Sequence, residues 1–253
     1  MYAAAGVKQW LHCAGRGPAT AVVVAGLGST ARDWTRVQKS FFAATRTCFY
    51  DRPGLGNSPA RANTGQILNA SIYAKELWAL LGAAHEPGPY IVVGHSYGGL
   101  VARTFIHQHL STIAGVLLAE SVDPGDKTTG KYWTEARHRI DLPASQKATD
   151  GGPKLGSRPL IVLSASRPDE NHLGGPTYGQ PAWMTKQWIA EQKADTRLST
   201  DSIHVIATSG HVLQQDNPAA TSKALAVLVH AVTTHQPLSC NAAWSAVKAK
   251  CSR

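Results

Sequence analysis

Glycines spaced around one serine carry the clearest chemical signal in this chain, in the stretch Gly94-His-Ser-Tyr-Gly98. An apolar segment typical of a strand, 89–93, precedes this stretch, and a segment typical of a helix, 99–106, follows it. In this strand–turn–helix order, a G-x-S-x-G pattern predicts a sharp turn that presents a serine hydroxyl at the edge of a sheet. The glycines relieve crowding in such a turn because they have no Cβ atom. We therefore expect Ser96 to be a nucleophile, with a plain structural turn as the alternative.

A serine hydroxyl is a weak nucleophile until a base takes its proton, and the chain holds 11 histidines. His211 lies in Ser209-Gly-His211, after an expected strand at 203–207 and before an expected helix. A histidine on a late loop fits the chain order nucleophile, acid, base, so we predict His211 as the base. His95 is next to the nucleophile in sequence, which does not bring its ring onto the hydroxyl. We expect it to pack beneath the turn.

Three carboxylates stand where one could orient the base and stabilise its charged form. Glu120 directly follows the apolar segment 115–119, and Asp123 lies three residues later. Asp169 follows the segment 159–166. The alternative for Asp123 is a turn residue before a proline, and the alternative for Asp169 is a loop or cap residue.

An oxyanion hole requires two backbone N–H donors aimed at the developing negative charge. The residue after the nucleophile, Tyr97, should supply one of them. Leu27 should supply the other, because it stands between Gly26 and Gly28 in the loop after the apolar segment 22–24. Glycines at these places let the backbone approach a substrate closely.

The segments that must position these residues alternate between two periodicities. Strands are expected at 7–12, 20–24, 47–50, 89–93, 113–118, 159–163 and 202–207, and helices at 33–44, 66–84, 99–106 and 218–234. Strands that alternate with helices at this spacing predict an α/β fold, with a mostly parallel central sheet and helices on both faces.

Two stretches interrupt this alternation, at 123–158 and 167–200. Both follow strands on the expected active-site side. We predict a single domain over 1–253, with a small cap within 123–158 and a pocket-lining excursion at 167–200. Large side chains there either line an apolar substrate pocket or hold the cap on the core. These residues are Tyr132, Trp133, Tyr178, Trp183, Met184 and Trp188.

Composition narrows the function classes. Of the 253 residues 43% are hydrophobic and 16% charged, as in a folded globular chain, and no apolar run approaches the roughly 18 residues that span a bilayer. The net charge of +9 comes from scattered residues, so we expect a basic surface without a nucleic-acid partner. His107 and His109 are two apart and fall on different helix faces, a poor metal-ligand geometry. We expect no metal, no cofactor and a monomer.

Four cysteines fall into two sequence-local pairs, Cys13 with Cys48 and Cys240 with Cys251, and none lies in C-x-x-C. Such pairs predict disulfides, with four buried free thiols as the alternative. Disulfides in turn predict a secreted, periplasmic or cell-surface protein. The first eight residues lack the basic and apolar regions of a secretory signal.

Together these residues resemble the α/β-hydrolase superfamily over nearly the whole chain, and in particular its secreted or exported bacterial serine hydrolases. The matching stretches are His12-Cys13, Ala25-Gly-Leu-Gly28, Thr45-Arg-Thr-Cys-Phe-Tyr-Asp-Arg52, Gly54-Leu-Gly-Asn-Ser58, the segment 88–99 and Ser209-Gly-His211. In such relatives the two early cysteines are paired, which supports the Cys13–Cys48 bridge. Ala25 departs from many members, which have a supporting histidine there.

The resemblance also bears on the acid. In some branches the acid follows the strand after the elbow helix in a Gly-x-x-x-x-acid pattern, which the stretch Gly115–Glu120 matches. In the commoner branch the next strand is followed by Gly-x-x-Asp, whereas Asp169 lacks that glycine and offset. We therefore favour Glu120, with Asp169 second.

The resemblance implies an esterase with the triad Ser96, His211 and Glu120, acting through an acyl-enzyme on a small or medium apolar ester. A serine nucleophile argues against the haloalkane dehalogenase and epoxide hydrolase branches, which use an aspartate. Two alternatives stay open because fold does not fix function. One is a non-catalytic or slow-turnover ligand-binding protein, and the other is a cofactor-free perhydrolase or lyase on the same triad.

Overall fold

The fold is organised around one large sheet. The computed structural model describes residues 1–62, 65–125, 130–149, 154–167 and 182–253, the last of these without the side chains of 182–185. Among these residues the sheet has nine strands, in the spatial order β1-β2-β4-β3-β5-β6-β9-β10-β11. They are β1 (Tyr2–Ala4), β2 (Val7–Ala14), β3 (Thr20–Val24), β4 (Arg46–Asp51), β5 (Tyr90–His95), β6 (Ile113–Ala119), β9 (Leu160–Ala165), β10 (Ser202–Ala207) and β11 (Ala249–Ser252). The strands from β4 to β10 run parallel, whereas β1, β2 and β11 pair antiparallel toward the two edges, which confirms the predicted mostly parallel sheet.

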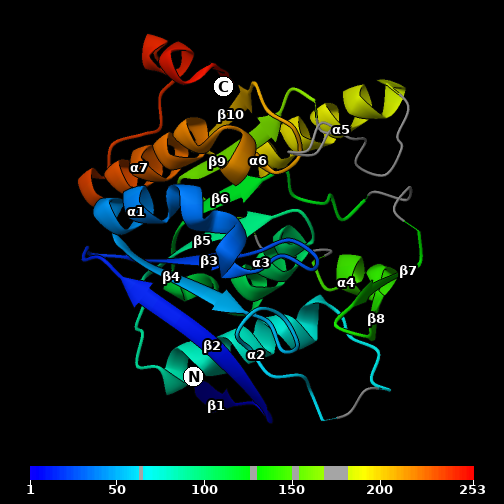
Figure 1. Ribbon diagram of the computed structural model, residues 1–253. Helices are drawn as coiled ribbons and strands as arrows, with labels where there is room; N and C mark the ends of the chain where they lie inside the picture. The colour runs from blue at the N-terminus through cyan, green and yellow to red at the C-terminus, as the bar shows by residue number, and fades with distance from the viewer. Residues whose placement is uncertain (63–64, 126–129, 150–153, 168–181) are drawn as a thin grey trace.

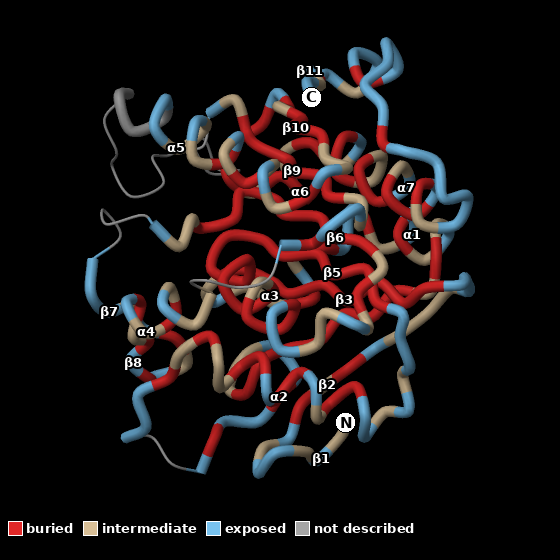
Figure 2. Tube along the Cα trace, turned by 180° about the vertical axis from the view of Figure 1, so that it is seen from behind, coloured by how far each residue is buried: buried red, intermediate tan, exposed pale blue. Residues whose placement is uncertain are grey.

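Helices cover both faces of the sheet, with α2 and α3 on one face and α1 and α7 on the other (Figure 1). The α-helices are α1 (Thr35–Ala44), α2 (Ala70–Ala83), α3 (Tyr97–Gln108), α4 (Leu142–Lys147), α5 (Ala182–Asp195), α6 (Leu213–Asp216) and α7 (Pro218–Thr234). Short 3₁₀ helices lie at Ala31–Trp34, Leu110–Thr112, Thr196–Leu198 and Ala242–Val247. Successive strand residues face opposite sides, so Val22 and Val24 belong to one buried cluster and Ala21 and Val23 to the other. Figure 2 shows the central strands buried as a result.

One helix begins later than its apolar pattern predicts. The helix expected from residue 66 begins at Ala70, because the side chain of Asn69 accepts a hydrogen bond from the Ile72 N–H at 3.2 Å and caps it there. Leu68, just before this N-cap residue, is extended, and its N–H donates to the Arg139 carbonyl at 2.8 Å. The residues before α2 are therefore held by a distant segment rather than by the helix.

That distant segment is a hairpin within 123–158, the stretch expected to hold a cap. Strands β7 (Tyr132–Glu135) and β8 (His138–Asp141) pair antiparallel and lead into α4. The two residues between them, Ala136 and Arg137, have φ angles of 48° and 68°, as a tight two-residue hairpin turn requires. We call β7, β8 and their turn the cap hairpin. In Figure 1 it lies with α4 to one side of the sheet.

The large side chains of the two interrupting stretches differ in their surroundings. Tyr132 is exposed, with the Arg139 guanidinium 3.9 Å from its ring centre. Trp133 instead lies edge-on to Tyr97, with the ring centres 5.9 Å apart. Trp188, on α5, contacts the His211 ring. Tyr178 and Asp169 lie outside the described residues, as do the side chains of Trp183 and Met184.

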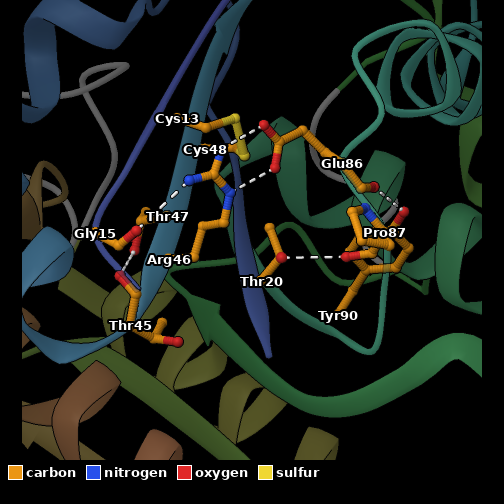
Figure 3. Close-up of a disulfide and its surroundings, with 10 residues drawn as sticks. All are labelled: Cys13, Gly15, Thr20, Thr45, Arg46, Thr47, Cys48, Glu86, Pro87 and Tyr90. Atoms are coloured by element: carbon orange, nitrogen blue, oxygen red, sulfur yellow. Dashed lines mark hydrogen bonds and ion pairs between the residues drawn. A yellow bond between two sulfur atoms is a disulfide. The ribbon is translucent and has the colours of Figure 1, made fainter. Parts of the chain in front are cut away.

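Both predicted disulfides are present, so all four cysteines are bonded and the alternative of free thiols is wrong. Cys13 and Cys48 are directly opposite each other on β2 and β4. In Figure 3, Arg46 on the same β4 strand forms a two-pronged ion pair with Glu86 beside this disulfide, at 2.6 and 2.5 Å. The two bridges indicate an oxidising compartment. None of the described helices is long and apolar enough to cross a membrane.

Candidate active site

Ser96 stands on a turn between β5 and α3 with a backbone that L-residues rarely adopt, at φ 53° and ψ −128°. The glycines on either side are required by close packing. A Cβ on Gly98 would overlap the carbonyl oxygen of Val24, and one on Gly94 would lie 2.8 Å from the Cβ of Ala102. The Ser96 carbonyl accepts hydrogen bonds from the Gly99 N–H in α3 at 2.9 Å and from the Val122 N–H, past the end of β6, at 3.1 Å. The predicted strand–turn–helix is therefore present, and its strain is held by the neighbouring chain.

His211 and Glu120 lie together, although they are 91 residues apart in sequence. His211 is in the loop between β10 and α6, and its Nδ1 is 3.2 Å from Oε2 of Glu120. Because an ionised carboxylate can only accept, Nδ1 donates in this contact. The other ring nitrogen, Nε2, is then free to accept a proton, which is the tautomer that a general base needs.

Glu120 has no exposed surface and sits just past β6 with a φ of 47°. Besides His211, its carboxylate accepts from the Ala165 N–H at 2.8 Å and from the Trp188 indole N–H at 3.0 Å. These donors compensate for the loss of water around a buried charge. Ala165 ends β9, so its strand fixes one carboxylate oxygen while α5 helps to fix the other.

Asp123, the nearby alternative, is engaged elsewhere. Its side chain accepts from the Gly125 N–H at 2.6 Å. It also lies beside Asp195, whose pKa burial raises to about 6, against the charge of Arg103 and with a further contribution from Asp123. The structure therefore brings Glu120, and not Asp123, to His211. Asp169 cannot be compared because it lies outside the described residues.

His95 packs under the Ser96 turn and contacts His211 through both its backbone and its ring. Its Nε2–H donates to the backbone carbonyl of His211 at 2.9 Å, and the two rings are 5.0 Å apart. Burial lowers the pKa of His95 to about 3, repulsion from His211 adds to this, and the hydrogen bond to the His211 backbone opposes it. His95 is therefore a neutral donor that fixes the loop of His211.

The loop after β3 makes a turn against Ser96. The Ser29 N–H donates to the Gly26 carbonyl at 3.1 Å, and Gly28 has a φ of 67° that favours glycine. A Cβ on Gly26 would lie 3.1 Å from the Cβ of Ser96, so this backbone approaches Ser96 closely. Leu27 is the second residue of this turn. Tyr97 is the first residue of α3, where a backbone N–H has no partner within the helix.

Three residues that sequence reasoning missed surround this loop. Arg52 donates to the carbonyls of Ala25 and Gly26 and forms an ion pair with Glu135 of the cap hairpin. Tyr73 on α2 donates to the same Glu135 carboxylate at 2.7 Å. Arg52 stands in the stretch that carries the family resemblance, which is a signal that could have found it. Glu135 and Tyr73 stand in no pattern.

These parts follow the carboxyl ends of β3, β5, β6 and β10, which meet at one edge of a parallel sheet, where α/β proteins bind their ligands. A model described as the alpha/beta hydrolase family matches residues 21–162. The chain belongs to the alpha/beta hydrolase family. The match includes Ser96 and Glu120, whereas His211 lies beyond it.

Relatives of this hydrolase include uncharacterized proteins. It is 27% identical over 224 residues to YqjL of Bacillus subtilis, and the alignment covers 82% of each chain. It is 28% identical over 184 residues to a protein of Schizosaccharomyces pombe, in an alignment that covers 71% of this chain and 31% of that protein. The hydrolase thus spans about a third of the length of the S. pombe relative.

Solved structures share the fold over most of the hydrolase. A thermophilic esterase from Thermogutta terrifontis aligns with a TM-score of 0.64 and 16% identity, over 89% of this chain and 94% of that one. A proposed ancestral haloalkane dehalogenase aligns with a TM-score of 0.68 and 10% identity, over 92% and 98%. At such identities the comparison establishes the fold alone, so the chemistry must be argued from the site.

Proposed function

We propose that this hydrolase is a serine esterase that cleaves small or medium apolar carboxylic esters through an acyl-enzyme. The observation that carries the proposal is the contact of His211 with a buried Glu120, on the same sheet edge as Ser96. A carboxylate that orients a histidine beside an elbow serine is the arrangement that acyl transfer requires. Esterases among the structural neighbours agree with this, but at low identity.

In the proposed reaction the Ser96 hydroxyl attacks the acyl carbon while Nε2 of His211 takes its proton. The carbonyl oxygen becomes an oxyanion, which accepts hydrogen bonds from the N–H groups of Leu27 and Tyr97. Collapse of this intermediate expels the alcohol, which takes the proton from His211. A water molecule then attacks the acyl carbon while His211 takes its proton. The second tetrahedral intermediate collapses as the bond between the Ser96 oxygen and the acyl carbon breaks, which releases the acid, and His211 returns the proton to the Ser96 oxygen. Glu120 holds the ring in position and stabilises its charged form. These steps balance without a metal or an organic cofactor.

The surroundings support an apolar substrate and an exported protein as parts of the same proposal. Trp188 lies edge-on to the His211 ring, with the centres 6.1 Å apart, and Trp133 lies against Tyr97. Aromatic side chains at these places favour apolar acyl groups. The two disulfides support a secreted, periplasmic or cell-surface location.

A fluorophosphonate probe tests the nucleophile, because it reacts covalently with activated serines. We expect one label on the native hydrolase and none on Ser96→Ala, which should retain its unfolding midpoint. Failure to label the native chain, or equal labelling of the variant, would leave a non-catalytic ligand-binding protein as the better explanation. Labelling that is accompanied by turnover only with peroxide would indicate a perhydrolase.

Hydrolysis of p-nitrophenyl esters tests the acid. We expect Glu120→Gln to lower kcat by about 10²- to 10⁴-fold, since the buried histidine then loses its charged partner. Asp123→Asn and Asp169→Asn should stay within about 5-fold of the native enzyme. If Asp169→Asn alone loses most activity, the assignment of Glu120 is wrong.

A further inference from the structure

A buried ion pair brackets Leu27, the residue proposed above to supply one oxyanion donor. We propose that Arg52 and Glu135 are positioning residues that aim the Leu27 N–H at the oxyanion, and that the cap hairpin is thereby a working part of the oxyanion hole. This inference rests on the proposed esterase function. It adds two residues and one structural element to the machinery of that site.

Arg52 acts on the peptide bond before Leu27. Its Nη2–H donates to the carbonyl of Gly26 at 2.5 Å, and its Nη1–H donates to the carbonyl of Ala25 at 2.6 Å. A trans peptide is planar, so the C=O and N–H of one unit point in opposite directions. A guanidinium that holds the Gly26 oxygen therefore fixes the direction of the Leu27 N–H on the other side of the same peptide plane. Its positive charge also polarises that peptide and strengthens the donor.

Glu135 acts on the peptide bond after Leu27. Its Oε1 accepts a hydrogen bond from the Gly28 N–H at 2.7 Å. The same carboxylate accepts from Arg52 at 2.6 and 2.9 Å and from the Tyr73 hydroxyl at 2.7 Å. Both peptide units that contain Leu27 backbone atoms are thus held by side chains of one network. The two ends of the turn cannot rotate without breaking a hydrogen bond to a charged group.

The network is charged and dry. The side chains of Arg52 and Glu135 are 2% and 0% exposed. Burial acts to raise the pKa of Glu135, but the charge and hydrogen bonds of Arg52 and the donors from Gly28 and Tyr73 outweigh it, so that the pKa lies below its usual value. Arg52 and Glu135 are therefore a true ion pair, and one member without the other would leave a buried charge unpaired.

Stability alone is a poor reason for this pair, since a buried ion pair commonly stabilises a fold no better than well-packed apolar residues. What it supplies is direction, through a planar guanidinium with several fixed donors. The chain also provides a matched comparison. Arg61 and Glu76 form a second two-pronged ion pair, which is also buried and also has its guanidinium near the Tyr73 ring. Among the described residues, however, Arg61 makes no hydrogen bond to the loop of Leu27.

The test compares Arg52→Lys with Arg61→Lys. Lysine keeps the charge but cannot hold two carbonyls and a carboxylate in one plane. We expect Arg52→Lys to lower kcat by about 10- to 100-fold with KM within about 3-fold, because loss of a whole oxyanion donor costs about 10²–10³. Affinity for a trifluoromethyl ketone, which forms a tetrahedral adduct on the serine, should fall by the same factor. Affinity for the matching methyl ketone should not change. Arg61→Lys should resemble the native enzyme in all three measurements.

The failure of this inference is distinguishable from failure of the esterase proposal. If the native enzyme neither labels nor hydrolyses esters, the esterase proposal fails and this inference falls with it. If the native enzyme is active and a folded Arg52→Lys keeps its kcat and ketone affinity, only this inference is overturned. If Arg52→Lys does not fold, Tyr73→Phe provides the test instead. It keeps the charges of Arg52 and Glu135 but removes the hydrogen bond that the Tyr73 hydroxyl donates to Glu135. We expect its kcat to fall at least about 3-fold, and an unchanged kcat would refute the role of the network.

Discussion

Acidification should destabilise this hydrolase through His95, the neutral donor that fixes the His211 loop. In the folded chain the pKa of His95 is lowered to about 3, whereas the unfolded residue titrates near its ordinary value of 6.5. The unfolded chain therefore takes up a proton between these values that the folded chain does not. The stabilising effect of a neutral His95 is complete above pH 6.5 and is lost as the pH falls toward 3.

The size of the effect follows from the same two values. Each pH unit over which only the unfolded state binds the proton is worth about 1.4 kcal/mol. At pH 5 the unfolded histidine has been protonated over about 1.5 units and the folded one hardly at all. His95 should thus account for about 2 kcal/mol of lost unfolding free energy between pH 7 and pH 5, a large part of the 5–15 kcal/mol typical of a domain.

The pH dependence of the unfolding free energy of the native protein combines the titrations of several groups. Burial, with a smaller effect of Lys193, lowers the pKa of His204 to about 4, which destabilises the fold in acid in the same way. Asp195, whose pKa is raised to about 6, acts in the opposite direction because its folded form binds the proton more tightly. A variant that removes only the titration of His95 separates its share from theirs.

His95→Gln is that variant, because a glutamine amide can still donate to the His211 carbonyl but does not titrate. Urea unfolding measures how much unfolding free energy each protein loses between pH 7 and pH 5. This loss should be smaller by about 2 kcal/mol in His95→Gln than in the native protein. The exposed histidine at 107 provides a control, and His107→Gln should show the native loss. If His95→Gln and the native enzyme lose the same free energy within about 0.5 kcal/mol, the reasoning is refuted.

Three further predictions concern single features of the site and its frame. Trp188→Phe removes the indole donor from Glu120 and should lower kcat on p-nitrophenyl esters by about 10-fold or more with little change in KM, since hydrogen bonds to charged groups are worth about 1.5–3 kcal/mol; an unchanged kcat would show that the remaining donors suffice. Gly98→Ala should cost more than about 2 kcal/mol in urea unfolding, because its Cβ overlaps a strand carbonyl, whereas equal stability would mean that the turn can relax. Removing the Cys240–Cys251 bridge by a double serine substitution should cost about 3 kcal/mol, from the small loop that it closes, and a native unfolding midpoint would contradict that.

Local sequence patterns predicted those parts of the site that local geometry determines. The Ser96 turn needs a strand, two glycines and a helix within a few residues, so sequence spacing alone identified it. Glu120 and His211 could be placed because each directly follows a strand whose carboxyl end lies at the same sheet edge. The late start of α2 at Ala70 shows the limit of this approach. Its apolar periodicity continues upstream, but pairing of Leu68 with the cap hairpin draws those residues away.

Glu135 was missed, and Trp188 was expected only to line a pocket or hold the cap, because no short pattern records the contacts that these two residues make. Glu135 is 83 residues from Arg52, and Trp188 is 68 residues from Glu120. Neither has a neighbour in sequence that suggests a role. Each is brought in by a segment that interrupts the strand–helix alternation, and the packing of such segments is decided by the folded core and not by their own periodicity.

The placement of the two disulfides has a consequence for how the sheet opens. Cys13–Cys48 fastens β2 to β4 near one margin, and Cys240–Cys251 fastens the chain before β11 at the other. The parallel strands that carry Ser96, Glu120 and His211 lie between them. In reduced protein, backbone amides of the outer strands should exchange with solvent deuterium well before those of β5 and β6. In a reducing environment the outer strands of the sheet should therefore separate before the central ones. The proposed esterase activity would be among the last properties to be lost.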